Sequence, residues 1–137
     1  MLFRSGLPPD AVRFLGPVSD VGTVYHASDV FVLPSLYDPC ANVCIEAMAA
    51  GLPVVTSAAN GAAELVEGTA ADAILPDPLD VAGLADRLIR LLDADVRRTR
   101  GEAGRAVAGG LSHQRMVEET ALVCERARDE RRSRAQG

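Results

Sequence analysis

Two acidic side chains at the ends of a short loop-and-helix pattern are the residues of this chain best placed to do chemistry. Asp38 and Glu46 are separated by seven residues, and Asn42 lies between them. An asparagine at the start of a helix can cap it by accepting a hydrogen bond from a first-turn amide. The free amides of that turn and the helix dipole together attract negative charge. The spacing therefore predicts an anion-binding loop that leads into a helix at Asn42.

Alternating strand and helix patterns surround this segment. Strands are predicted at residues 12–16, 30–33, 54–56 and 73–75, and helices at residues 19–28, 42–50 and 61–67. The run Val30–Leu33 is entirely apolar, which is typical of a parallel strand covered on both faces. The alternation predicts an α/β protein with a Rossmann-like parallel sheet. Three further helix patterns, beginning near Asp80, Ala94 and Ser112, predict a helical cover at the C-terminal side.

The stretch V-F-V-L-P-S-L-Y-D-P-x-x-N-V-x-x-E-A-M-A-A-G-L-P-V-V resembles the donor-site signature of a known enzyme family. It is similar to that of the retaining glycosyltransferases of family 4, which have the GT-B architecture of two facing Rossmann-like domains. The resemblance extends from about Val12 to about Arg126. The first acid is Asp38, where the commonest family pattern has Glu. This D-P-x-x-N-V variant resembles the glucosyltransferases of the bacterial lipopolysaccharide core.

The resemblance implies a role for each residue of the loop and helix. Glu46 would accept hydrogen bonds from the ribose hydroxyls of a nucleotide-sugar, and Asp38 would lie beside the donor sugar as a catalytic residue. The loop backbone would meet the sugar hydroxyls and the diphosphate, through Pro39, Cys40, Ala41, Asn42 and Val43. Gly16 would border the nucleobase. Family members work without a metal ion or another cofactor, because the nucleotide-sugar is a substrate.

Each of these residues also has a purely structural interpretation. Asp38 precedes a proline and suits a turn. Glu46 near the start of a helix is favourable with the helix dipole and needs no ligand. Asn42 is expected to act first as a helix cap and second as a ligand. Glu64 more often caps or supports a helix than binds a substrate.

Composition limits the possible functions. The chain has 137 residues, is 48% hydrophobic and carries a formal net charge of -5. These values predict a globular protein with a real core and disfavour nucleic-acid binding. The three cysteines, Cys40, Cys44 and Cys124, are too few for a disulfide framework and are expected to be buried or half-buried free thiols. They indicate a reducing compartment, so we expect a cytoplasmic protein.

All 14 basic residues are arginine, and they crowd toward the C-terminus. The plain interpretation is a set of solvated helix faces. The alternative is contact with anionic lipid or a lipid-linked acceptor at the inner face of the membrane. No apolar run reaches the ~20 residues that a membrane-spanning helix needs.

The family's basic pair, which clamps the diphosphate, has no counterpart in this sequence. The expected organisation is a lead segment at residues 1–11, a partial GT-B C-terminal donor-binding domain at residues 12–128 and a frayed tail at residues 129–137. An N-terminal acceptor domain is expected to be missing. The chain is therefore interpreted as the C-terminal fragment of a glycosyltransferase.

Three functions remain open. The first is a glycosyltransferase fragment that, when complete, moves a hexose from a nucleotide-sugar to a glycan or lipid-linked acceptor with retention, and is inactive alone. The second is a non-catalytic remnant that binds sugar nucleotides. The third is an α/β interaction domain with an eroded site.

Overall fold

A pair of parallel strands lies at the centre of the molecule. The structure, a computed structural model, describes residue 8 and residues 11–134. Strand β1 (Phe31–Leu33) pairs with strand β2 (Val54–Thr56) in parallel, with Val32 opposite Val55. Parallel pairing requires a crossover connection, which here contains a helix. The α/β fold class with parallel strands is therefore confirmed.

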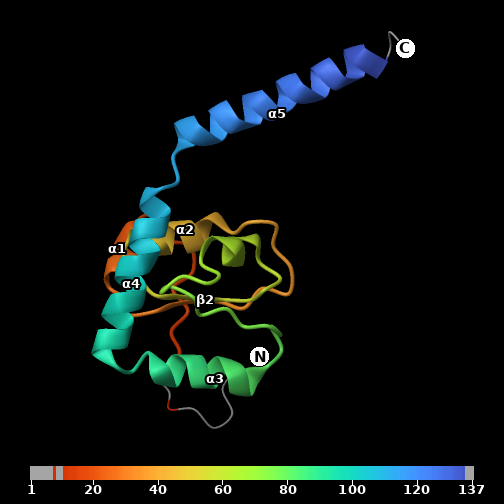
Figure 1. Cartoon of the computed structure of the whole chain (residues 1–137). Helices are drawn as coiled ribbons and strands as arrows, with labels where there is room; N and C mark the ends of the chain where they lie inside the picture. The colour runs from red at the N-terminus through yellow and green to blue at the C-terminus, as the bar shows by residue number, and fades with distance from the viewer. Residues whose placement is uncertain (1–7, 9–10, 135–137) are drawn as a thin grey trace.

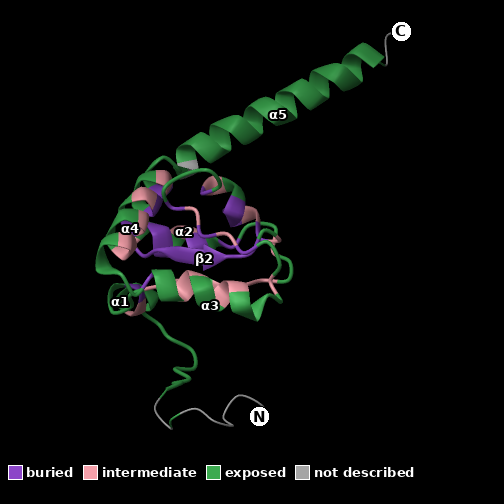
Figure 2. Ribbon diagram, turned by 60° about the horizontal axis from the view of Figure 1, so that its bottom comes forward, coloured by how far each residue is buried: buried purple, intermediate pink, exposed green. Residues whose placement is uncertain are grey.

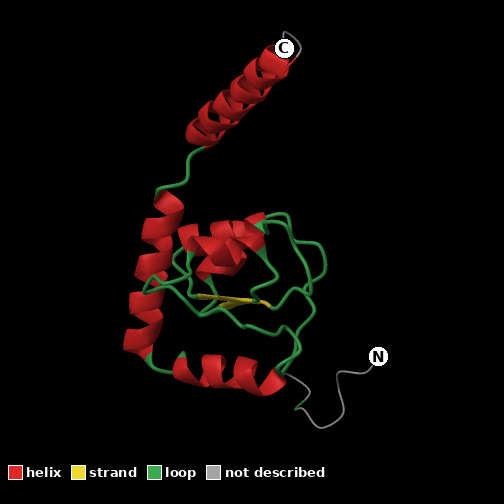
Figure 3. Cartoon of the chain, turned by 45° about the vertical axis from the view of Figure 1, so that its right-hand side comes forward, coloured by secondary structure: helices red, strands yellow, loops and turns green. Residues whose placement is uncertain are grey.

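Helices cover both faces of the strand pair. Helix α2 (Asn42–Ala49) lies on one face, and helix α3 (Val81–Arg90) lies on the opposite face (Figure 1, Figure 3). Residues on the strands alternate between these faces. Val54 belongs to the core cluster that includes Met48 of α2. Its neighbour Val55 belongs to a second cluster, against α3.

The other elements surround this centre. They are α1 (Val21–His26), the 3₁₀ helix η1 (Gly61–Leu65), α4 (Ala94–Gly109) and α5 (His113–Arg134). Helix α1 ends two residues before the predicted end at Ser28. Helix α4 packs along α2, whereas α5 projects away from the body. Figure 2 shows the buried residues gathered around β2 and α2 and an exposed α5.

Aspartate side chains begin three of the helices. Asp20 accepts a hydrogen bond from the Thr23 amide, and Asp80 accepts one from the Gly83 amide. Asp93 does the same for α4. Each side chain satisfies an amide that has no partner within its own helix. The predicted starts near Asp20 and Asp80 are confirmed.

Two predicted strands do not form. Residues 12–16 are exposed irregular chain, and Phe14 is 77% exposed. The segment 73–75 contributes only an isolated parallel bridge between Ser57 and Leu75. A strand needs a hydrogen-bonded neighbour along its length. Among the described residues, the segment 12–16 pairs with no strand, and the segment 73–75 pairs through one residue.

The tail also differs from the prediction. Helix α5 runs to Arg134 and so passes the predicted fray point at Asp129. Residues 135–137 lie outside the described part of the chain, as does most of the predicted lead at residues 1–11. No helix of the described residues is both long enough and apolar enough to cross a membrane.

Candidate functional site

The loop that carries Asp38 connects the end of β1 to the start of α2. Its backbone is tied to the loop after β2, because the Asp38 amide donates to the Ala59 carbonyl (3.1 Å) and the Gly61 amide donates to the Asp38 carbonyl (2.9 Å). One carboxylate oxygen of Asp38 accepts the Cys40 amide at 3.0 Å. Asp38 thus forms the turn that its sequence context predicts, with its second oxygen not used by that bond. The loop lies beyond the carboxyl ends of parallel strands, where α/β proteins bind ligands.

Asn60 holds the second side of this loop. Its Oδ1 accepts hydrogen bonds from the amides of Ala41 (3.3 Å) and Ala62 (3.0 Å). Its amide nitrogen lies 3.7 Å from the Cys44 sulfur. The side chain is 1% exposed, so these contacts are shielded from water. Asn60 therefore joins the loop that carries Asp38, η1 and α2 at one buried point.

Gly61 allows the two loops to approach closely. A Cβ atom at this position would overlap the carbonyl oxygen of Pro39 and lie 2.8 Å from its carbon. Any side chain here would push the Asp38–Cys40 turn away from its place. The Asn60–Gly61 motif could be recognised in the sequence, but the close contact of Gly61 with the Pro39 carbonyl could not be predicted from it.

The start of α2 differs from the prediction in one residue. Ala41 is the capping residue and makes no side-chain cap, so the predicted cap by Asn42 is wrong. Asn42 is the first helical residue, and its side chain is exposed. The helix begins at Asn42, so Ala41 occupies the capping position, and Asn60 from another loop accepts a hydrogen bond from the Ala41 amide. Pro39, Cys40 and Val43 are also exposed, whereas Ala41 is buried.

Glu46 lies on the second turn of α2 and is oriented by a tyrosine. The Tyr25 hydroxyl donates a hydrogen bond to Glu46 Oε2 at 3.0 Å. Tyr25 itself is 8% exposed and packs edge-on against Phe31, with ring centroids 5.9 Å apart. Burial and the bond to Glu46 raise the pKa of Tyr25, so the phenol remains a donor at neutral pH. This bond uses one of the two carboxylate oxygens of Glu46.

Tyr25 is a site residue that sequence reasoning missed. The sequence pattern placed it only on the apolar face of a short helix. A buried tyrosine usually finds a partner for its hydroxyl, and this was the available signal. The partner could not be identified because it is 21 residues away in the sequence.

The cysteines occupy different environments. Cys44 is fully buried beneath the loop, and burial raises the pKa of its thiol. Cys40 and Cys124 are exposed. The prediction of free thiols is confirmed, but burial holds for Cys44 alone. The described residues contain no group of three or more His, Cys, Asp or Glu arranged to hold a metal ion.

Gly16 is not brought to the loop by a strand. It lies in the exposed irregular segment before α1, with a positive φ of 67°. Asp38, the residues from Pro39 to Val43 and Glu46 lie on one continuous loop-and-helix segment, and Gly16 lies outside it. The candidate site therefore has two carboxylates, one in the loop before α2 and one on the second turn of that helix.

This arrangement agrees with the protein's relatives. A family model described as glycosyl transferases group 1 matches residues 2–94, which is more than half of the chain. The chain belongs to the group 1 glycosyltransferases. The sequence-based recognition of a glycosyltransferase is thereby confirmed.

Individual relatives of these group 1 enzymes give the same result. The chain is 37% identical over 95 residues to the lipopolysaccharide core biosynthesis glycosyltransferase LpsD of Rhizobium meliloti (strain 1021), covering 69% of this chain and 27% of that protein. It is 36% identical over 120 residues to spore coat protein SA of Bacillus subtilis (strain 168), covering 85% and 32%. The names of these two relatives describe different functions.

A solved structure of a GT-B glycosyltransferase matches the fold. It is the sucrose-phosphate synthase of Thermosynechococcus elongatus, with a TM-score of 0.76 and 30% sequence identity. The match covers 89% of this chain and 31% of that chain. The chain thus spans roughly a third or less of the length of the relatives it matches.

Proposed function

We propose that this chain is the nucleotide-sugar donor-binding part of a glycosyltransferase. In the complete enzyme a hexose is transferred, with retention, from a nucleotide-diphosphate sugar to a glycan or lipid-linked acceptor. The observation that carries the proposal is the carboxylate of Glu46, which Tyr25 orients on the second turn of α2. A carboxylate can accept hydrogen bonds from both hydroxyls of a ribose, and the free amides at a helix start can donate hydrogen bonds to a diphosphate.

Each site residue has its own part in this proposal. Glu46 binds the ribose, and the loop from Pro39 to Val43 places its amides against the diphosphate and the sugar. Asp38 faces the sugar with the oxygen that the turn leaves free. Amide donors that meet the developing charge on the leaving diphosphate would stabilise the transition state electrostatically. No metal ion or further cofactor is part of this mechanism.

A non-catalytic sugar-nucleotide binding role is the second candidate. The loop and helix from Asp38 to Ala49 contain two carboxylates and no arginine. A diphosphate would therefore meet amides but no guanidinium from this segment, which favours weak binding. In this alternative the chain binds a sugar nucleotide and takes part in no transfer.

The test is a nucleotide titration by calorimetry or ligand-observed NMR, with UDP, GDP, ADP and their sugars. One diphosphate should bind, and Glu46→Ala should weaken it about 10- to 100-fold, because hydrogen bonds to a charged group contribute ~1.5–3 kcal/mol. Glu67→Ala is the matched control, since Glu67 is an exposed acid outside the site. Equal loss in both variants, or no binding by the folded chain, would reject a donor site on this chain.

Activity is tested separately. The chain should release no sugar from the bound donor onto an acceptor by itself. Transfer that appears only after an acceptor-binding partner is added supports the first candidate. Donor binding without transfer under that condition supports the second.

A further inference from the structure

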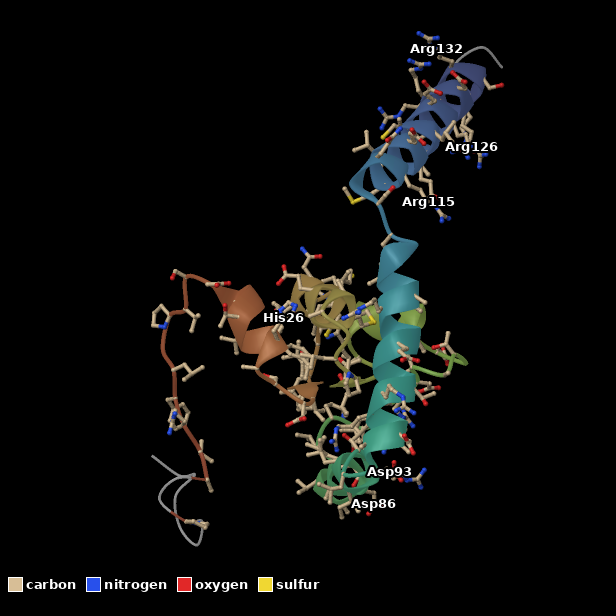
Figure 4. The ribbon with its side chains drawn as sticks, turned by 90° about the vertical axis from the view of Figure 1, so that its left-hand side faces the viewer. His26, Asp86, Asp93, Arg115, Arg126 and Arg132 are labelled. Atoms are coloured by element: carbon tan, nitrogen blue, oxygen red, sulfur yellow. The ribbon has the colours of Figure 1, made fainter. Side chains whose placement is uncertain are left out.

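A hollow lies on the side of the molecule opposite α2. It has a volume of about 380 Å³ and is lined by residues 72–74, by Arg100 of α4 and by Asp86, Arg87 and Arg90 of α3. Figure 4 shows Asp86 on α3, at the end of the molecule far from α5. None of the proposed donor-binding residues lines it. The volume is within the range of small-molecule sites, toward its lower end.

Arg87 is fixed in this hollow by uncharged acceptors. Its Nε and Nη2 donate to the Ile74 carbonyl at 2.9 and 2.6 Å, and its Nη1 donates to the Gly83 carbonyl at 3.0 Å. Carbonyl oxygens satisfy part of the guanidinium but leave its full positive charge in place. The side chain is therefore held in position and remains available to an anion.

Arg100 approaches the hollow from a different helix in the same way. Its Nη1 donates to the backbone carbonyl of Asp72. The Asp72 carboxylate accepts hydrogen bonds from the amides of Gly68 (3.3 Å) and Ile74 (3.1 Å). In the described part of the chain, no carboxylate forms an ion pair with Arg87, Arg90 or Arg100. Three unpaired cations thus line one small space.

We propose that this hollow binds a small phosphate-type dianion, either inorganic phosphate or a phosphate monoester. Guanidinium groups match the oxygens of phosphate with paired hydrogen bonds. The lining also contains two carboxylates, Asp72 and Asp86, which weaken the attraction of the three guanidinium groups without cancelling it.

The helix dipole alone does not account for this cluster. Arg87 and Arg90 lie in the last turn of α3, where cations are favourable with or without a ligand. Arg100 belongs to the middle of α4, so the dipole of α3 does not explain its position. Its presence in the lining of the same hollow is the observation that points to a shared anion.

The test is amide and arginine side-chain NMR mapping with inorganic phosphate and with glycerol phosphate, at constant ionic strength in chloride. Saturable shifts are expected at residues 72–74 and 86–90. Arg90→Gln should weaken binding about 5- to 10-fold, as expected for one partly solvated charge-assisted contact. Asp86→Asn should tighten it. Arg98→Gln is the control, because Arg98 is exposed and pairs with Asp95 outside the hollow.

Three results would overturn the proposal. They are no saturation up to ~20 mM phosphate, equal affinities of wild type and Arg90→Gln, and shifts confined to residues 39–43. The last result would assign the anion to the donor loop instead. Tighter binding of glycerol phosphate than of inorganic phosphate would identify a monoester as the ligand, and the reverse would identify free phosphate. Glu46→Ala should leave both affinities unchanged, which separates this site from the donor site.

Discussion

The hydrogen bond between Tyr25 and Glu46 is the residue-scale feature on which the proposed donor binding depends most directly. It fixes one oxygen of the carboxylate at 3.0 Å from a buried phenol. This bond already restricts the rotamers of Glu46, so the side chain would lose less conformational entropy on binding a ligand. The interaction joins α1 to α2, so a residue outside the donor signature takes part in the site.

Tyr25→Phe should therefore weaken nucleotide binding several-fold and lower the free energy of unfolding by about 1 kcal/mol, because one hydrogen bond is lost and the ring packing is kept. Tyr37→Phe is the control, since Tyr37 is 79% exposed. Calorimetry and urea unfolding measure the two effects. Unchanged binding in Tyr25→Phe would show that the phenol does not orient Glu46.

The same pair predicts a pH dependence. Folding raises the pKa of Tyr25 above its ordinary value of 10.0, so the folded state keeps a proton that the unfolded state releases. The stabilisation is complete below pH 10 and declines as the pH rises above it. Unfolding measurements at increasing pH should show the difference in stability between wild type and Tyr25→Phe becoming smaller above this value.

Gly61→Ala tests the contact between the two loops. The new methyl group would overlap the Pro39 carbonyl, so the turn at Asp38 must move. We expect a loss of about 1–3 kcal/mol in stability, as for other overpacked sites, together with weaker donor binding. Gly109→Ala has open space around its Cβ and should fold as the wild type does. Full stability and full binding in Gly61→Ala would contradict the close approach.

At the scale of elements, the contact of α4 with α2 organises the body. Two glycines of α4 make it possible: Gly101 lies against the backbone of Gly51, and Gly104 against the side chain of Met48. Both glycines are buried. The small residues let the helix approach the turn between α2 and β2 closely, which a side chain would prevent.

Gly101→Ala should lower the stability by about 1–3 kcal/mol, although alanine is intrinsically the better helix former by ~1 kcal/mol. The added methyl would overlap the Gly51 carbonyl, so packing outweighs propensity. Thermal and urea unfolding measure the change. Gly109→Ala, in the same helix, should be neutral or slightly stabilising, and equal effects of the two substitutions would show that helix propensity alone acts.

The sequence predicted elements well where their determinants are local. The pattern around Val54–Thr56, the stop at Gly51 and the starts at Asp20 and Asp80 all depend on neighbouring residues. Residues 12–16 have a strand-like pattern but no strand beside them, and a pattern cannot supply a hydrogen-bonding partner.

The candidate site was predictable in part for the same reason. Asp38 and the helix near Glu46 were found from spacing and from the family resemblance. Asn60 and Tyr25 act across 19 and 21 residues of sequence, so only the folded chain brings them to Ala41 and Glu46. The expected cap at Asn42 was wrong because Ala41, held by the distant Asn60, occupies the capping position one residue earlier.

At the scale of the whole molecule, α5 stands apart from the body. Every described side chain from residue 114 to residue 134 is exposed, and Arg115, Arg126 and Arg132 extend outward from this projecting helix (Figure 4). Removing residues 113–137 should therefore change the unfolding free energy of the body by no more than about 0.5 kcal/mol.

Urea unfolding followed by circular dichroism measures this, with the lost helix subtracted. A truncation after Arg100 is the control. It removes the buried residues Gly101, Gly104 and Ala108, and should unfold the chain. A large destabilisation on removing α5 alone would mean that the helix packs on the body in solution.

The projecting helix also determines how the molecule moves in water. The accessible surface is 10047 Å², against about 6,800 Å² for a compact protein of this mass. A 22-residue helix is about 33 Å long, more than twice the ~13 Å radius of gyration of a 100-residue domain. Rotational diffusion should accordingly be anisotropic, slower end over end than about the long axis. Amide bonds aligned with α5 would report this difference in their ¹⁵N relaxation rates, and the Stokes radius would exceed that of a sphere of 14.4 kDa.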